Sequence, residues 1–283
     1  MATFDIRNGV LYGAKYDGNE KTIEIPEQVK HIKKLSIRHH VERLMIGPSV
    51  LKIDKNAFRD GTNLSEIVVK NPYFVLKDEC LFDRNQKVLY LAQRNVHKKL
   101  VLPQSLEIIS DYAFAHCSSL TSIKINKNLK YLGAFAFNEC MNLKEVNLPD
   151  VHEYELKEAV FEGCSSLKKI IIPKNINALG VRSFFDCWKL ETIEIRTNRI
   201  QAIPLECFAY CEKLPRIDFC DGVENIDDGA FINCRSLVEI TLPKSIRKIG
   251  IEVFSDDENL TVVTSSPALI AYCERFNIPT IKA

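Results

Sequence analysis

The sequence has no long apolar run and no excess of charge of one sign. No apolar stretch approaches the roughly 20 residues that a membrane-spanning helix needs, so no membrane segment is predicted. The 38 basic and 37 acidic residues give a formal net charge of +1, which provides no general attraction for nucleic acid or an anionic membrane. Residues 1–7 lack the basic and then apolar profile of a secretory signal. This favours a cytoplasmic location, with a secreted or cell-surface location as the alternative if a leader has been removed.

Motifs of cofactor and metal chemistry are also missing. Neither of the glycine-rich phosphate loops, G-x-G-x-x-G or G-x-x-x-x-G-K-[ST], is present. The chain does not contain the two closely spaced Cys or His pairs that a structural zinc site needs. We therefore predict no cofactor, no metal site and no enzymatic activity, and the alternative is a thiol- or metal-dependent hydrolase.

The sequence does contain a repeat of 23 or 24 residues. A phenylalanine anchors each copy, as at Phe114, Phe137 and Phe161 (137 − 114 = 23; 161 − 137 = 24). The series continues at Phe184, Phe208, Phe231 and Phe254, and an earlier copy lies at Phe58. Most copies have a small residue before the phenylalanine, a cysteine three residues after it, a leucine six residues after it, and then an alternating apolar run such as residues 123–125. Such alternation is typical of a short strand with one buried face, and this period indicates a solenoid whose coils bury their apolar residues against one another.

A second similarity relates two segments at an offset of 70 residues. Residues 4–12 match residues 74–82, and each segment leads to a strand that ends at a proline, Pro26 or Pro103. We interpret both as β-hairpin modules. The predicted organisation is one domain over 1–283, with a hairpin cap (1–26), first coils (27–70), a hairpin insertion (71–103), regular repeats (104–264) and a C-terminal cap (265–283). In the last segment, Leu269, Cys273 and Phe276 have helical spacing, and a final strand is predicted at 278–281.

These patterns predict a leucine-rich-repeat solenoid, a right-handed superhelix with a parallel β-sheet on the concave side, short helices or turns on the convex side, and inserted β-hairpins. Residues 109–125, 132–149 and 226–243 resemble the BspA-type leucine-rich-repeat family, whose coils read roughly I-G-x-x-A-F-x-x-C-x-x-L-x-x-I-x-I-P. Residues 8–12 and 271–278 are also similar to that family. Its known members are mostly bacterial and protozoan surface proteins that bind host or partner proteins. The resemblance therefore implies protein binding and cell adhesion.

Six of the ten cysteines occupy one position of the repeat, three residues after the phenylalanine. We interpret them as a ladder of small buried side chains, because parallel neighbours do not present the dihedral angle of a disulfide. Asp257 takes this position in the last repeat. Cys220 follows a strand and is predicted to be an exposed thiol. His116 precedes the ladder residue Cys117, but sequence neighbours seldom have the geometry of a nucleophile and its base, so we predict no catalytic pair.

The predicted binding surface is the concave face of the sheet, formed by the middle residue of each strand. Repeat proteins characteristically use this face to bind partners. Its first members form an apolar stretch of the kind that often marks an interaction site, unless the hairpins cover Met45 and Val68. The predicted binding residues are Met45, Val68, Val101, Lys124, Asn147, Ile171, Glu194 and Asp218. We predict a non-catalytic interaction scaffold whose partner is another protein, with adhesin-like binding of a host protein or carbohydrate as the alternative; the partner's identity and the oligomeric state are left open.

Overall fold

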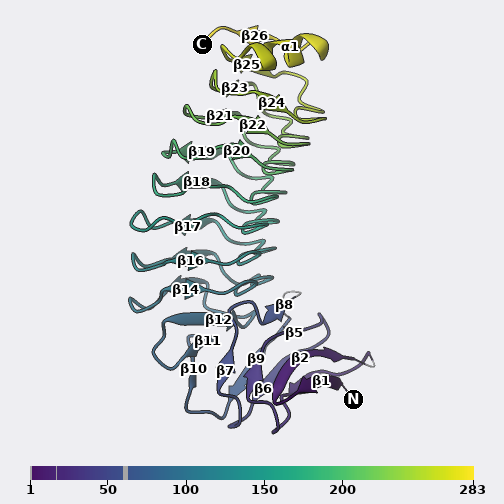
Figure 1. Cartoon of the computed structure of the whole chain (residues 1–283), viewed down its shortest axis with the longest axis vertical. Coiled ribbons are helices and arrows are strands. Elements are labelled where there is room, and N and C mark those ends of the chain that lie inside the picture. Colours follow the sequence, from purple (N-terminus) through teal and green to yellow (C-terminus); the bar gives the residue numbers. More distant parts are fainter. Residues whose placement is uncertain (1, 17, 60–62) are drawn as a thin grey trace. The chain divides into compact units, whose positions relative to one another are not determined.

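The structure is a computed structural model that describes residues 2–16, 18–59 and 63–283. Two compact units make up the chain, residues 1–140 and residues 141–283. Short strands recur in both units, and one helix lies near the C-terminus (Figure 1). The single domain expected from the sequence stays a prediction.

The first unit opens with a β-hairpin formed by β1 (Thr3–Arg7) and β2 (Val10–Lys15). Asn8 and Gly9 make the turn, with φ angles of 49° and 76°. Positive φ at both central residues suits the twist of an antiparallel pair. On its other edge β2 pairs in parallel with β4 (His31–Ile32), which pairs with β7 (Lys52–Ile53). The predicted N-terminal hairpin is thus joined directly to the first coils.

The insertion at 71–103 also has the predicted hairpin. The strands β10 (Phe74–Lys77), β11 (Cys80–Asp83) and β12 (Val88–Ala92) pair in antiparallel fashion in that order. β12 then pairs in parallel with β14 (Ile108–Ile109), and β14 with β16 (Tyr131–Leu132). The last strand of the insertion, β12, therefore pairs directly with the strand ladder of the regular repeats.

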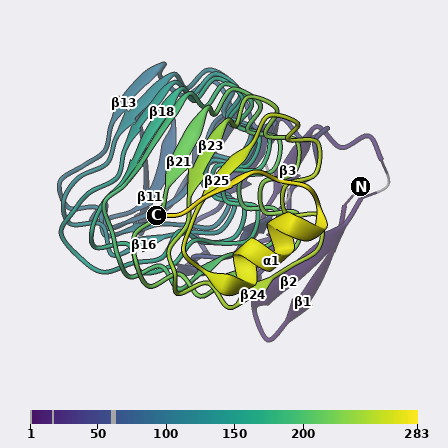
Figure 2. The same ribbon diagram turned by 90° about the horizontal axis from the view of Figure 1, so that it is seen from above.

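A parallel row of strands follows the alternating runs of the sequence. In the first unit it consists of β3 (Thr22–Glu24), β6 (Arg43–Ile46) and β9 (Glu66–Val69), and of β13 (Lys99–Val101) with β15 (Ser122–Lys124). In the second unit it consists of β17 (Glu145–Asn147), of β18 (Lys169–Ile172) with β19 (Thr192–Ile195), and of β21 (Arg216–Asp218), β23 (Glu239–Thr241), β25 (Thr261–Val263) and β26 (Thr280–Ile281). Figure 2 shows β21, β23 and β25 stacked on one side of the second unit. Alternate side chains point inward, so Ile123 is buried while its neighbour Lys124 is exposed.

Two-residue strands form a second set of parallel ladders that the sequence analysis did not predict. Besides β14 and β16, this set contains β5 (Leu35–Ser36) with β8 (Phe58–Arg59), and β20 (Ala202–Ile203), β22 (Asn225–Ile226) and β24 (Lys248–Ile249). Most of these strands lie just before the phenylalanine turn of their coil, as β22 lies before Phe231, whereas β8 contains Phe58 itself. The sequence carries only a pair of apolar residues there, and two residues are too few to display alternation.

Turns, not helices, carry the phenylalanine in the coils from Phe114 to Phe254. Residues two positions before and two positions after the phenylalanine have positive φ, as at Arg182 (54°) and Asp186 (56°) around Phe184. In this conformation the N–H groups of Arg182, Phe184 and Asp186 donate to carbonyls of the next coil. The rings stack from coil to coil, with Phe184 and Phe208 at a centroid distance of 5.4 Å and an interplanar angle of 1°. Backbone hydrogen bonds between successive coils and a column of stacked phenylalanine rings therefore stabilise the buried turns.

The C-terminal cap contains the helix α1 (Pro267–Arg275). Ser266 caps its N-terminus by accepting a hydrogen bond from the N–H of Leu269, and proline begins the first turn, where its missing N–H is not needed. Leu269 and Cys273 are buried, as their helical spacing predicts. Phe276 follows the helix and is 50% exposed, so it does not cover the core as they do. Among the described residues, no helix is both long and apolar enough to cross a membrane.

Candidate functional site

The predicted binding residues lie on the parallel strand row, which we call the strand face. In the first unit, Met45 on β6 pairs with Val68 on β9, and Val101 on β13 pairs with Lys124 on β15. In the second unit, Ile171 pairs with Glu194 across β18 and β19, while Asn147 and Asp218 occupy β17 and β21. The register thus agrees with the sequence. The ladder that holds Met45 and Val68 is separate from the one that holds Val101.

Exposure differs along the strand face. Met45, Val68 and Ile171 are half-buried, whereas Val101 is 65% exposed. The hairpin strand β10 lies against β9, the strand that carries Val68. Val101 is therefore the predicted apolar binding residue that offers the most surface to a partner, while Lys124, Asn147, Glu194 and Asp218 are exposed and polar.

Arginines balance the acidic side chains on the strand face of the second unit. Arg196 donates to Glu194 over 2.7 Å, and this hydrogen bond lowers the pKa of Glu194. Arg216 contacts both Asp218 (3.0 Å) and Glu239 (2.8 Å). Partial burial raises the pKa of Asp218, but hydrogen bonds from Arg216 and Thr241 outweigh that effect and lower it. The acidic side chains on this part of the strand face are therefore largely neutralised by arginines on the same strand or next to it.

The cysteine ladder is buried, as predicted. Thiols donate to the carbonyl of the phenylalanine one coil earlier, with sulfur–oxygen distances of 3.0 Å for Cys140 and 3.1 Å for Cys234. Burial raises the pKa of the Cys140 thiol to about 12 and that of Cys234 well above its ordinary value. Such thiols stay protonated and act as small hydrogen-bond donors rather than nucleophiles. Cys220 is exposed, as its position predicted.

Three histidines, His31, His97 and His116, pair with carboxylates rather than with cysteines. His31 lies 2.8 Å from Asp54, and His116 lies 3.2 Å from Glu139 on the next coil. His116 thus faces away from its neighbour Cys117. Within residues 2–16, 18–59 and 63–283, no three His, Cys, Asp or Glu side chains gather in a way that could hold a metal ion.

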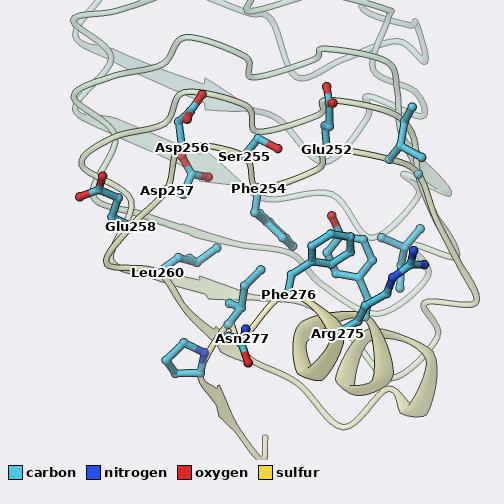
Figure 3. A pocket seen from close by; sticks show the side chains of 16 residues that line it. Glu252, Phe254, Ser255, Asp256, Asp257, Glu258, Leu260, Arg275, Phe276 and Asn277 are labelled. Carbon is cyan, nitrogen blue, oxygen red and sulfur yellow. The ribbon is translucent and has the colours of Figure 1, made fainter.

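A cavity of about 610 Å³ lies beside the C-terminal cap, and the sequence analysis did not predict it. One side is the last coil, through residues 249–252, 254–258 and Leu260. The other side is formed by Tyr272 and Arg275 near the end of α1 and by residues 276–279 after it (Figure 3). Phe254 is buried in it, whereas Phe276 is half-exposed. The helical spacing of Phe276 with Leu269 and Cys273 had predicted a core position for Phe276 in the C-terminal cap. The three consecutive acidic residues at 256–258 are the sequence signal from which a polar site could have been predicted here.

Asp257 occupies the ladder position of this last coil. Both of its carboxyl oxygens are buried without a hydrogen-bond partner of good geometry among the residues described. Burial raises the pKa of Asp257 to about 8, and a weaker interaction with the backbone at Cys234 opposes this shift. Near neutral pH the carboxyl is therefore mostly protonated, and it is uncharged like the thiols of the preceding coils.

Comparison with known proteins agrees with the repeat architecture. A family model described as a BspA type leucine rich repeat region, in six copies, matches residues 15–95, 91–198 and 189–275. Comparison with curated proteins gave no significant match.

Solved structures give the same fold at low sequence identity. A leucine-rich repeat protein from Eubacterium ventriosum has a TM-score of 0.59 and 20% identity, over 87% of this chain and 61% of that protein. The pneumococcal vaccine antigen PcpA has a TM-score of 0.59 and 20% identity, over 93% of this chain and 68% of its own. The leucine-rich repeat protein of T. pallidum has a TM-score of 0.57 and 23% identity, over 74% of this chain and 94% of its own. The chain thus spans less than two thirds of the length of the E. ventriosum protein.

Proposed function

The chain belongs to the BspA-type leucine-rich-repeat family, and from this premise we propose that it is a non-catalytic scaffold that binds another protein. Its stacked coils place rows of side chains at fixed spacing on a rigid surface, which suits recognition rather than chemistry. The buried, protonated ladder thiols support the same reading, because a thiol hydrolase needs an accessible thiolate.

The partner would bind the strand face of the first unit, around Val101. The observation that carries this proposal is the 65% exposure of Val101, the last residue of β13, beside the exposed Lys124 on β15. Burying an exposed valine against a partner removes apolar surface from water, at about 25 cal/mol per Å². Lys124 would add a charged contact at the edge of that apolar centre, as at many protein interfaces.

A capture experiment with a matched variant tests this surface. Wild-type chain, Val101→Glu and Val238→Glu serve as parallel baits in a lysate of the native source. Val238 is 51% exposed and lies just outside β23, so it controls for adding a carboxylate at an exposed valine. We expect a discrete protein to be captured by wild type and Val238→Glu and lost with Val101→Glu. Equal capture by all three baits would remove the strand face of the first unit from the proposal.

In a second form of this proposal, the chain lies at the cell surface and binds its partner as an adhesin does. Its support is the likeness to the pneumococcal protein, which is described as a vaccine antigen. The cytoplasmic location expected from residues 1–7 stays a prediction. Protease treatment of intact cells separates the two, because a surface protein is digested and a cytoplasmic one is protected until lysis.

A further inference from the structure

The cavity at the C-terminal cap has an aromatic wall that runs from the core to the surface. Phe254 meets Tyr272 edge-on at a centroid distance of 6.2 Å, and Tyr272 packs against Phe276 at 4.7 Å. Ile251 lies at the rim and is 68% exposed. A volume of about 610 Å³ falls in the range of ligand sites, roughly 300–1,000 Å³. Large apolar side chains left exposed around such a hollow mark it as a binding surface.

Uncompensated acidic charge surrounds this wall. Glu252, Asp256 and Glu258 line the cavity, and none of them forms an ion pair with any residue that the structure describes. Arg275 is the basic side chain of the lining, and its guanidinium lies 5.4 Å from the centre of the Phe276 ring rather than on an acid. The acids of the strand face, by contrast, are paired with arginines. The rim therefore keeps a net negative charge available for a ligand.

A smaller hollow of about 380 Å³ continues the acidic rim. It shares Asp256 and Glu258 with the cavity and adds Asn233, Arg235 and Asn259. Asp256 accepts a hydrogen bond from Asn233 (3.2 Å), and Arg235 donates to the same Asn233 (3.2 Å). Asp257 is not part of the exposed set, because its carboxyl oxygens are buried. Because the two hollows share Asp256 and Glu258, they adjoin each other, which suits a short segment better than a single ion.

We propose that this cavity binds a basic segment of a partner protein. One arginine or lysine would place its charged head at Glu252 and a second would place its head at Glu258, at the other end of the lining (Figure 3). An apolar side chain between them would pack on Phe276 and Ile251. Cationic side chains with long apolar stems suit such a place, because the stem covers aromatic surface while the head stays at the acidic rim. The proposal does not depend on the strand face, which lies on other elements.

Binding of short synthetic peptides to the full chain tests the proposal. The probe is acetyl-Arg-Phe-Arg-amide, with acetyl-Gln-Phe-Gln-amide and acetyl-Glu-Phe-Glu-amide as charge controls, followed through the backbone amide signals of Gly250 and Asn277 by NMR. We expect saturable shifts at both amides with the arginine peptide. The glutamine peptide binds about tenfold more weakly, as expected from the loss of two charge–charge contacts, and the acidic peptide gives no shift.

Variants separate the site from general electrostatic attraction. Glu252→Gln with Glu258→Gln, and separately Phe276→Ala, should each weaken binding of the arginine peptide about fivefold or more. Glu274→Gln should leave it unchanged, because Glu274 lies on α1 but does not line the cavity. Unperturbed amide signals elsewhere show that Phe276→Ala remains folded.

Two results would overturn the proposal. Equal affinity of the three peptides, or of Glu252→Gln/Glu258→Gln and wild type, would show that the acidic rim recognises nothing. Shifts of Gly250 and Asn277 that grow with protein concentration in the absence of peptide would assign the cavity to a second copy of this chain instead.

Discussion

Replacing Asp257 with cysteine should stabilise the C-terminal end of the chain. The carboxyl group stands where preceding coils place a thiol that donates to a phenylalanine carbonyl, as Cys234 does to Phe208 over 3.1 Å. Burial raises the pKa of Asp257 from 3.8 to about 8. Between those values the unfolded chain is ionised while the folded chain holds a proton, so the free energy of unfolding falls as pH rises from about 4 to about 8.

The size of this effect follows from the shift. At 1.36 kcal/mol per pKa unit, holding the proton at pH 7 destabilises the fold by about 4 kcal/mol, and partial solvent exposure reduces this to about 2–4 kcal/mol. Asp257→Cys and Asp257→Asn both remove the penalty, and the cysteine can also make the thiol–carbonyl hydrogen bond of the preceding coils. Both variants should exceed wild type by this amount at pH 7 and by at least as much at pH 8. At pH 4 the advantage should fall below about 1 kcal/mol, because the unfolded carboxyl, with its ordinary pKa of 3.8, is then still about half protonated.

Urea unfolding at pH 4, 6 and 8 measures the difference, with hydrogen exchange of the amides in α1 as the local probe because ends of repeat arrays can open separately. Asp221→Asn, at an exposed aspartate of the same unit, is the matched control and should change stability by less than about 0.5 kcal/mol. The reasoning fails if the advantage of Asp257→Cys is absent at pH 8 or is the same at pH 4.

Three further predictions concern the rest of the fold. Gly250→Ala should lower the free energy of unfolding in urea by about 3 kcal/mol or more, because the new Cβ would lie 2.5 Å from the backbone nitrogen of Asp228. Gly229→Ala has a φ of +59° but a nearest contact of 3.5 Å, so it should lower that free energy by only about 1 kcal/mol. Equal losses in the two variants would contradict this account. Hydrogen bonds from Lys130 and Lys87 lower the pKa of Glu107 to about 2, so its carboxyl carbon signal should titrate near pH 2 and return to the ordinary range in Lys130→Met/Lys87→Met; a wild-type midpoint above pH 4 would refute the pairing. In the folded chain one thiol, Cys220, should react quickly with a disulfide reagent, and Cys220→Ser should abolish that phase; a fast phase that persists in Cys220→Ser would mean that a ladder thiol is accessible.

Regular spacing made the fold predictable from the sequence. The recurring phenylalanine, cysteine and leucine fix which side chains each coil buries, and the buried Phe184 column and the register of Met45 with Val68 agree with that pattern. The two-residue strands, such as β22, were not predicted because backbone hydrogen bonds between coils, rather than side-chain alternation, define them. The turn conformation was left open between turn and short helix, since the positive φ residues at this position range from Arg182 to Gly229 and share no side-chain chemistry.

The binding surfaces were less predictable than the core. Periodicity places Met45, Val68 and Val101 on one face, but it does not say how far neighbouring segments cover them, and the structure leaves Val101 much more exposed than the other two. Phe276 has the spacing of a core residue, yet it lies one residue beyond the last helical residue and faces solvent. Ends of a repeat array lack a neighbour on one side, so residues there do not inherit the environment of the internal copies.

Site-specific photo-crosslinking in cells of the native source tests the central claim most directly. A photoreactive amino acid replaces Lys124 on the strand face or, as the control, the exposed Glu224 of the second unit, each with and without Val101→Glu. We expect a discrete crosslinked protein from position 124, lost when Val101→Glu is added, and none from position 224. Adducts at position 224 without any at 124, or adducts at 124 that survive Val101→Glu, would contradict the account that this family member binds its partner through the strand face around Val101.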